Sequence, residues 1–373
     1  MSGYACPNCR QLVQFEASAC DSCGAALAYD PAIDGLRRWD RTAGDWLDGA
    51  GAGTGLTACG NMRYMACNWL VAPGGGALCR SCCHNRIIPD LAVPGVLERW
   101  RKTEAAKRRM IRGLIRIGLP LEPGGGQPLL FDMLYDPAAE QGQQPRLLTG
   151  HAGGVITLNL IEADDVARER IRHALGEPYR TLLGHFRHEV AHHYWHRLVE
   201  YSADIWPFRR LFGDERADYG AALAAHYAHP LPPTGWQDDY VSAYATVHPW
   251  EDFAETFAHY LHIVDTLQTV EAVSPQLVPG APPPPPFDPY AAGVGTLIER
   301  WIPCAFALNA VNRSLGQRDL YPFHLAPGIM LKFDFVHRLV AFAAGRWTPG
   351  EAEGADIRAL MATLGHGVQQ PAP

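Results

Sequence analysis

Cysteine placement constrains this chain more than any other feature of its sequence. Nine of the ten cysteines lie within the first 83 residues, and Cys304 stands alone in the C-terminal part. Thiols stay reduced in a cytosol, where closely spaced cysteine pairs more often bind a metal ion than form disulfides. We therefore expect a cytoplasmic protein whose first quarter is held together by metal ions.

Two Cys-x-x-Cys pairs open the chain. Each such pair forms a tight turn that points two thiolates at one ion, and two pairs complete a zinc tetrahedron. A segment of about 30 residues buries too little apolar surface to fold alone, so metal binding has to supply the missing free energy. Disulfides or inert thiols are the alternative. The predicted ligands of this first structural zinc site are Cys6, Cys9, Cys20 and Cys23.

A second cysteine group follows a glycine-rich stretch. Two of its members repeat the Cys-x-x-Cys spacing, whereas seven residues separate the other two, which is looser than in a standard ribbon. Four thiolates again suit a structural zinc ion. The predicted ligands of this second site are Cys59, Cys67, Cys79 and Cys82. The sequence leaves open whether Cys83 or His84 takes one of these places.

Composition places the chain among folded proteins. Its 373 residues are 47% hydrophobic and 19% charged, which allows a sizeable core and two or three domains. The formal charge of −7 argues against a protein that coats nucleic acid or an anionic membrane by bulk charge. No apolar run approaches the roughly 20 residues that a transmembrane helix needs, and the first residues lack a signal-peptide pattern. We expect no membrane association.

Residues 96–117 combine basic and apolar side chains at helical spacing, with Arg108 and Arg112 between Trp100 and Leu114. This pattern predicts a basic amphipathic helix. We interpret its basic face as the solvated side of a linker helix that packs against the next domain, in preference to a nucleic-acid surface.

Beyond this segment, short strands give way to helices. Residues 128–135 and 155–160 have the composition of strands, and the pattern from about residue 166 onward is mostly helical. Consecutive prolines predict an extended loop near residues 279–289. We expect an α+β protein in which a small, metal-held β region precedes a mostly helical domain. The predicted domains are residues 1–92 and 93–373.

The most informative segment is the His-Glu-x-x-His sequence at residues 188–192. Apolar residues around it recur at helical spacing, so the segment is expected to form a helix with one buried side. His188 and His192 then project from the same side of the helix, within reach of one zinc ion. Glu189 lies beside them, where its carboxylate can take a proton from a water activated by the metal.

Two histidines do not complete a catalytic zinc site, which needs a third protein ligand and an open position for water. His196 lies about 12 Å from His188 along a helix axis, too far to share one ion. A second helix is predicted to begin at Pro249, with Glu251 and Glu255 on one face. One of these carboxylates can bind the metal while the other orients a histidine ligand. An ordinary solvated acidic face is the alternative.

Together these motifs resemble a bacterial family in which zinc ribbons are fused to a zinc-binding metallopeptidase domain. The resemblance covers nearly the full chain. It rests on the two opening Cys-x-x-Cys pairs, the region from Cys67 to Leu91, the His-Glu-x-x-His helix, residues 248–261 and the Asn312-Arg-Ser sequence. It implies a zincin-like fold for the domain after residue 92 and zinc-dependent hydrolysis of a peptide or protein substrate.

A more distant likeness, to the lethal-factor-like gluzincins, implies individual roles. In that family the first Glu of a Glu-x-x-Ala-Glu string binds zinc, the second supports a histidine ligand, and a Tyr seven positions before the first Glu assists catalysis. The likeness implies that Glu251 is the third ligand, Glu255 its supporting neighbour and Tyr244 the catalytic assistant. One catalytic and two structural zinc ions are then expected.

A binding module is the competing hypothesis. Zinc ribbons are frequently interaction domains, and the basic helix could supply phosphate contacts. The ribbons would then bind nucleic acid or a partner protein, and the His-Glu-x-x-His domain would not be catalytic. In a third interpretation the ribbons bind no partner and only support the peptidase domain. The glutamate between the two histidines favours catalysis, because a purely structural site needs no base.

Overall fold

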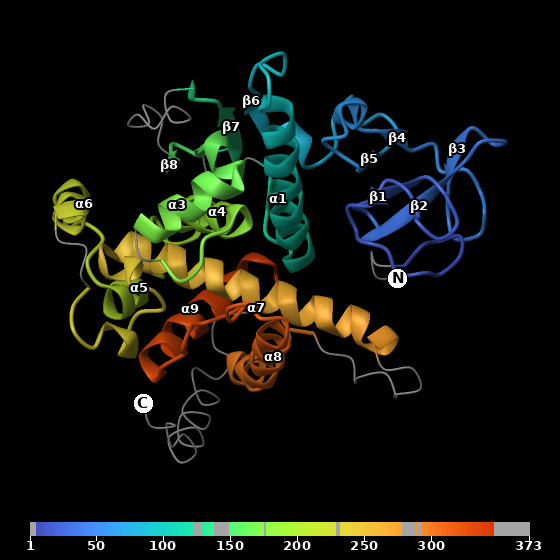
Figure 1. Cartoon of the computed structure of the whole chain (residues 1–373). Helices are drawn as coiled ribbons and strands as arrows, with labels where there is room; N and C mark the ends of the chain where they lie inside the picture. Colours follow the sequence, from blue (N-terminus) through green and yellow to red (C-terminus); the bar gives the residue numbers. More distant parts are fainter. Residues whose placement is uncertain are drawn as a thin grey trace. The chain divides into compact units, whose positions relative to one another are not determined.

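The computed structural model describes residues 5–122, 128–137, 149–174, 177–228, 232–277, 288–289 and 293–346 (Figure 1). These residues form two compact units. One takes in the residues up to Arg116 together with Leu121–Ile171, and the other comprises Ile117–Pro120 and the described residues from Arg172 onward. The proline-rich loop predicted near 279–289 lies outside the described residues, apart from Asp288 and Pro289. The predicted domain boundary between residues 92 and 93 stays a prediction.

Short antiparallel strands and single helical turns build the N-terminal part of the first unit. β1, β2 and β3 form one sheet, and β4 pairs with β5. Ala28, Trp46 and Leu70 pack into one buried cluster. Phe15, Tyr29 and Trp69 are also fully buried, and the ring of Tyr29 contacts the rings of the other two. The elements are β1 (Leu27–Asp30), β2 (Gly35–Asp40), β3 (Asp45–Leu47), β4 (Thr57–Ala58), η1 (Gly60–Tyr64), β5 (Leu70–Val71) and η2 (Cys82–His84).

A four-stranded sheet completes the first unit. Its order is β6-β7-β9-β8, with β7 parallel to both of its neighbours and β8 antiparallel to β9. The helix α1 connects β6 to β7, because two parallel neighbours need a crossover. The two strands predicted from composition are confirmed as β7 and β9. The elements are β6 (Asn85–Ile87), α1 (Val96–Ile117), β7 (Leu130–Leu134), β8 (Gly150–Ala152), β9 (Val155–Asn159) and η3 (Leu160–Ala163).

Several basic side chains of α1 form ion pairs within the first unit. Arg112 is buried, and its Nε lies 2.7 Å from Oδ1 of Asp34. Arg116 reaches the other oxygen of Asp34 at 3.2 Å, and Arg109 pairs with Glu16. Both acids belong to the N-terminal part of the unit. The helix is therefore confirmed, but the prediction that its basic face is solvated is wrong for these three arginines. That the helix packs against the next domain stays a prediction.

Helices dominate the second unit. Thr181 caps α4 by accepting a hydrogen bond from the backbone N–H of Gly184 (2.9 Å), and Pro249 occupies the first position of α7.

No described helix is both long enough and apolar enough to cross a bilayer. The predicted α+β class, a small β region followed by a mostly helical domain, is confirmed. The helix α3 (Asp165–Ala174) begins in the first unit and ends in the second. The other elements are α4 (Leu182–Leu198), α5 (Ile205–Phe212), α6 (Tyr219–Ala228), η4 (Trp236–Asp238), η5 (Tyr244–Thr246), α7 (Pro249–Leu277), α8 (Val294–Ser314) and α9 (Pro327–Ala343).

The long helix α7 is the centre of the second unit (Figure 1). On the side toward α4, the ring of Phe257 stacks on that of Tyr194, with centroids 5.9 Å apart. On the side toward α9, the ammonium group of Lys332 lies 2.6 Å from Oδ2 of Asp252 and donates a hydrogen bond to the carbonyl of Asp239. Both members of this ion pair are buried, so α9 fixes the first turn of α7.

Lys332→Met should lower the free energy of unfolding by about 3–5 kcal/mol, because it leaves the buried Asp252 without its counter-ion. Urea denaturation followed by circular dichroism measures the loss. Arg216→Met, which removes the exposed partner of Asp214, should leave the midpoint nearly unchanged. Adding Asp252→Asn to Lys332→Met should recover part of the loss. If Lys332→Met and Arg216→Met lowered the free energy of unfolding by the same amount, this account would be contradicted.

Candidate metal centres

The helix α4 presents His188 and His192 on one side, one helical turn apart. Their Nε2 atoms lie 3.3 Å from each other, and the two rings are nearly perpendicular with centroids 5.0 Å apart. Phe186, Val190 and Tyr194 on the same helix are fully buried. The buried side of α4 therefore fixes the direction in which the two imidazoles point.

Glu251, from the first turn of α7, meets these two imidazoles. Its Oε2 lies 2.9 Å from Nε2 of His188 and 3.7 Å from Nε2 of His192, and the side chain is 1% exposed. A tetrahedral zinc ion with bonds of roughly 2.0–2.1 Å separates its ligand atoms by about 3.3 Å. The three distances between these atoms, 2.9, 3.3 and 3.7 Å, lie around this value. The donor set of two imidazoles and one carboxylate suits zinc. The structure thus brings together the three predicted ligands.

Glu255, one turn further along α7, supports His188 from the other side of the ring. Its Oε1 lies 2.7 Å from Nδ1 of His188, and its Oε2 accepts a hydrogen bond of 2.6 Å from the hydroxyl of Ser242. A proton held on Nδ1 by Glu255 leaves Nε2 of His188 free to bind a metal ion. Glu255 lies where the gluzincin likeness implied a supporting residue.

The histidine and its two carboxylates form an ionic cluster. Burial tends to lower the pKa of His188, but Glu251 and Glu255 raise it well above its usual value. Burial tends to raise the pKa of Glu255, yet His188 and the nearby His259 bring it to about 2. Burial also tends to raise the pKa of Glu251, but His192 and His188 hold this pKa well below its usual value. A cation that binds Nε2 of His188 therefore has to displace a proton.

Glu189 follows His188 directly and is buried. Its Oε1 lies 3.4 Å from Nε2 of His185, one turn earlier on α4. Burial tends to raise the pKa of Glu189, but His185, His188 and His192 lower it overall. The side chain is thus an ionised carboxylate at neutral pH, which is the form that accepts a proton.

Tyr244 lies in η5, and its ring centroid is 5.9 Å from that of His188. Burial and the negative charge of Glu251 raise its pKa, so the phenol keeps its proton and can donate a hydrogen bond. The structure therefore places Tyr244 against a predicted metal ligand. Its role in catalysis stays a prediction.

Three polar side chains of this site were not predicted from the sequence. Tyr219 donates a hydrogen bond of 2.8 Å to Oε1 of Glu251, Ser242 donates to Glu255, and His185 lies beside Glu189. Tyr219 and Ser242 belong to no recognisable motif, so spacing alone gives no signal for them. His185 does have a signal, since it precedes Glu189 by one helical turn.

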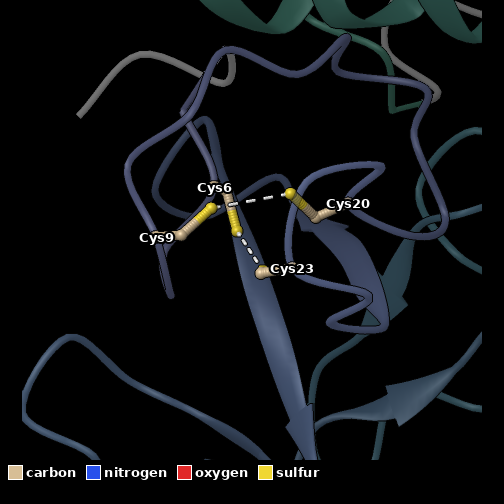
Figure 2. Close-up of side chains that lie close together, drawn as sticks. All are labelled: Cys6, Cys9, Cys20 and Cys23. Atoms are coloured by element: carbon tan, nitrogen blue, oxygen red, sulfur yellow. Dashed lines mark hydrogen bonds between the residues drawn. The ribbon is translucent and has the colours of Figure 1, made fainter.

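The first cysteine group lies in the first unit, where its two pairs of thiols face one another (Figure 2). The Sγ atoms of Cys6 and Cys23 are 3.8 Å apart, and those of Cys9 and Cys20 are 3.7 Å apart. A tetrahedral zinc ion with bonds of about 2.3 Å separates its sulfur ligands by about 3.8 Å. The four predicted cysteines therefore fit one zinc ion.

The second group consists of the four buried cysteines Cys59, Cys67, Cys79 and Cys82. The Sγ atoms of Cys67 and Cys79 are 3.7 Å apart, and the backbone N–H of Cys79 donates to the sulfur of Cys59. This geometry also fits zinc. Cys83 and His84, which the sequence left open, are not among the four. The Sγ of Cys83 contacts the carbonyl of Arg80, and Nδ1 of His84 lies 2.8 Å from the carbonyl of Leu129.

Comparisons with known proteins give matches to both parts of the chain. A family model described as putative zinc-binding metallo-peptidase matches residues 96–339, and a zinc-ribbon domain model matches residues 3–93. Uncharacterized proteins of Mycobacterium bovis and Mycobacterium tuberculosis are each 41% identical to this chain over 360 residues, which cover 94% of the chain and 99% of each relative. No solved structure matches the chain.

Proposed function

Since this chain belongs to the family described as putative zinc-binding metallo-peptidase, we propose that it hydrolyses peptide bonds with a zinc ion held by His188, His192 and Glu251. One observation carries the proposal. Two imidazole nitrogens of α4 and one carboxylate oxygen of α7 converge within 4.8 Å of one another. Two histidines and a glutamate are a ligand set of hydrolytic zinc sites, which keep a fourth position for water.

A zinc ion at these atoms would supply Lewis acidity and lower the pKa of a water in its open position to about 7. Glu189 accepts the proton of the attacking water and later delivers it to the leaving amine. Tyr244 donates a hydrogen bond to the oxygen on which negative charge develops. Glu255 holds the Nδ1 proton of His188 and so keeps the ring in the orientation that ligation needs.

The two cysteine groups would hold two further zinc ions with a structural role. All four positions of each ion would be filled by sulfur, so each ion would cross-link four points of the chain. Thiols stay reduced in a cytosol and are then available to bind zinc, which supports a cytoplasmic location.

The proposed partner is a peptide or protein substrate, and nucleic acid is not favoured. Arg109, Arg112 and Arg116 of α1 already pair with acidic side chains of the first unit. A phosphate would have to displace these acids, so the basic helix is a poor phosphate-binding surface.

Metal analysis of the purified chain should find three zinc ions per molecule. His188→Ala and Cys6→Ser should each bind one ion fewer, because each removes a ligand from a different site. His196→Ala and Cys83→Ser are matched controls that keep all three ions, since neither side chain belongs to a ligand group. An unchanged zinc content in His188→Ala would remove the basis of the proposed catalytic site.

Glu189→Gln should reduce peptide hydrolysis by roughly 10²–10⁴-fold, because the amide cannot accept the proton of the attacking water. Cleavage of a library of unstructured peptides, read by mass spectrometry, measures the loss. The variant should keep its three zinc ions. Glu200→Gln, on a side chain that pairs with His196, should keep full activity. A wild-type protein with three zinc ions and no cleavage of any peptide would favour the non-catalytic binding module instead.

A further inference from the structure

The two oxygens of Glu251 have different neighbours. Oε2 lies 2.9 Å from Nε2 of His188, on the side of the predicted metal ion. Oε1 accepts a hydrogen bond of 2.8 Å from the hydroxyl of Tyr219, the first residue of α6. A phenol with a pKa of about 10 is a donor at neutral pH, and an ionised carboxylate is an acceptor only. The hydrogen bond therefore has one possible direction.

The ring of Tyr219 is held by the same end of α7 that carries Glu251. It lies edge-on to His248 at a centroid distance of 5.2 Å and contacts Trp250 at 5.8 Å. His248 in turn places its Nε2 3.1 Å from the carbonyl of Ala217, two residues before Tyr219. These contacts pin the start of α6 to the start of α7, so the position of the hydroxyl relative to Glu251 is fixed.

We propose that Tyr219 is a positioning residue that keeps Glu251 a ligand through one oxygen only. This inference rests on the proposed function. A carboxylate can bind a metal ion through one or both oxygens, and a second bond from Oε1 would fill the position that a hydrolytic zinc site keeps for water. By holding Oε1, Tyr219 leaves that position open and fixes the orientation of the ligand.

Tyr219 and Tyr244 are therefore expected to act differently although both lie near the centre. The hydroxyl of Tyr219 contacts a ligand carboxylate, whereas the ring of Tyr244 lies against His188. Loss of the Tyr219 hydroxyl should change metal binding. Loss of the Tyr244 hydroxyl should reduce turnover and leave metal binding unchanged.

Zinc binding by the full-length Tyr219→Phe variant tests this proposal without any measurement of activity. The zinc ion of interest is the one that His188→Ala lacks, and competition with chelators of graded affinity measures its dissociation constant. We expect binding to be weaker by roughly 10- to 100-fold, the usual effect of removing a hydrogen bond to a ligand. Tyr227→Phe, on the same helix with an exposed ring, is the matched control and should bind as tightly as the wild type. Retention of the two cysteine-bound ions shows that the first unit is folded, and an unchanged helical circular dichroism signal shows the same for the second unit, which carries both tyrosines.

The absorption spectrum of cobalt bound at the same site tests the coordination directly. The visible spectrum of cobalt depends on which atoms bind the ion. Tyr219→Phe should give a changed spectrum, because Oε1 of Glu251 can then take the position of the water. A wild-type cobalt spectrum in Tyr219→Phe would overturn the proposal, whatever the zinc affinity. Absence of peptidase activity in the wild type would defeat the proposed function, while the zinc and cobalt results would still decide the role of Tyr219.

Discussion

The candidate metal centre depends on the packing of α4 against α7. Neither helix carries all three converging atoms, so His188 and His192 meet Glu251 only when the apolar sides of the two helices are in register. The stack of Tyr194 on Phe257 sets this register within the core. Farther along α7, an ion pair of 2.6 Å between Arg187 and Asp265 fixes it again. An ordinary hydrophobic contact thus determines the geometry of a site made of polar side chains.

The start of α7 carries three carboxylates, and each one has a partner from a different direction. Glu251 meets α4 and Tyr219, Glu255 meets His188 and Ser242, and Asp252 meets Lys332 of α9. Burial raises the pKa of Asp252 to about 7, against the opposing effect of Lys332, which indicates how costly this charge is inside the protein. Any shift of α7 would separate at least one of these three carboxylates from its partner. The hydrogen bonds and ion pairs of the three carboxylates therefore hold the helix in place.

The sequence predicts contacts that follow from spacing within one element, and it misses contacts between distant segments. His188 and His192 are four residues apart, and the Cys-x-x-Cys pairs are equally local. The choice of Glu251 over Glu255 as ligand came from a family likeness, because spacing leaves both open. Tyr219 reaches Glu251 across 32 residues, which no local pattern records. The basic face of α1 was misjudged for the same reason, since its acidic partners lie in a distant part of the sequence.

The cysteine groups and the histidine–glutamate group differ in the number of coordination positions that they leave open on a metal ion. Four sulfurs around an ion complete a tetrahedron, so the cysteine groups have no position for water and can only cross-link the chain. Two imidazoles and one carboxylate oxygen leave a fourth position, provided that the second oxygen of the carboxylate is engaged elsewhere. In this chain the hydroxyl of Tyr219 engages it. The proposed division between structural zinc in the first unit and hydrolytic zinc in the second therefore follows from the number of protein donor atoms at each ion. At the proposed hydrolytic site, a single hydrogen bond to Glu251 keeps that number at three.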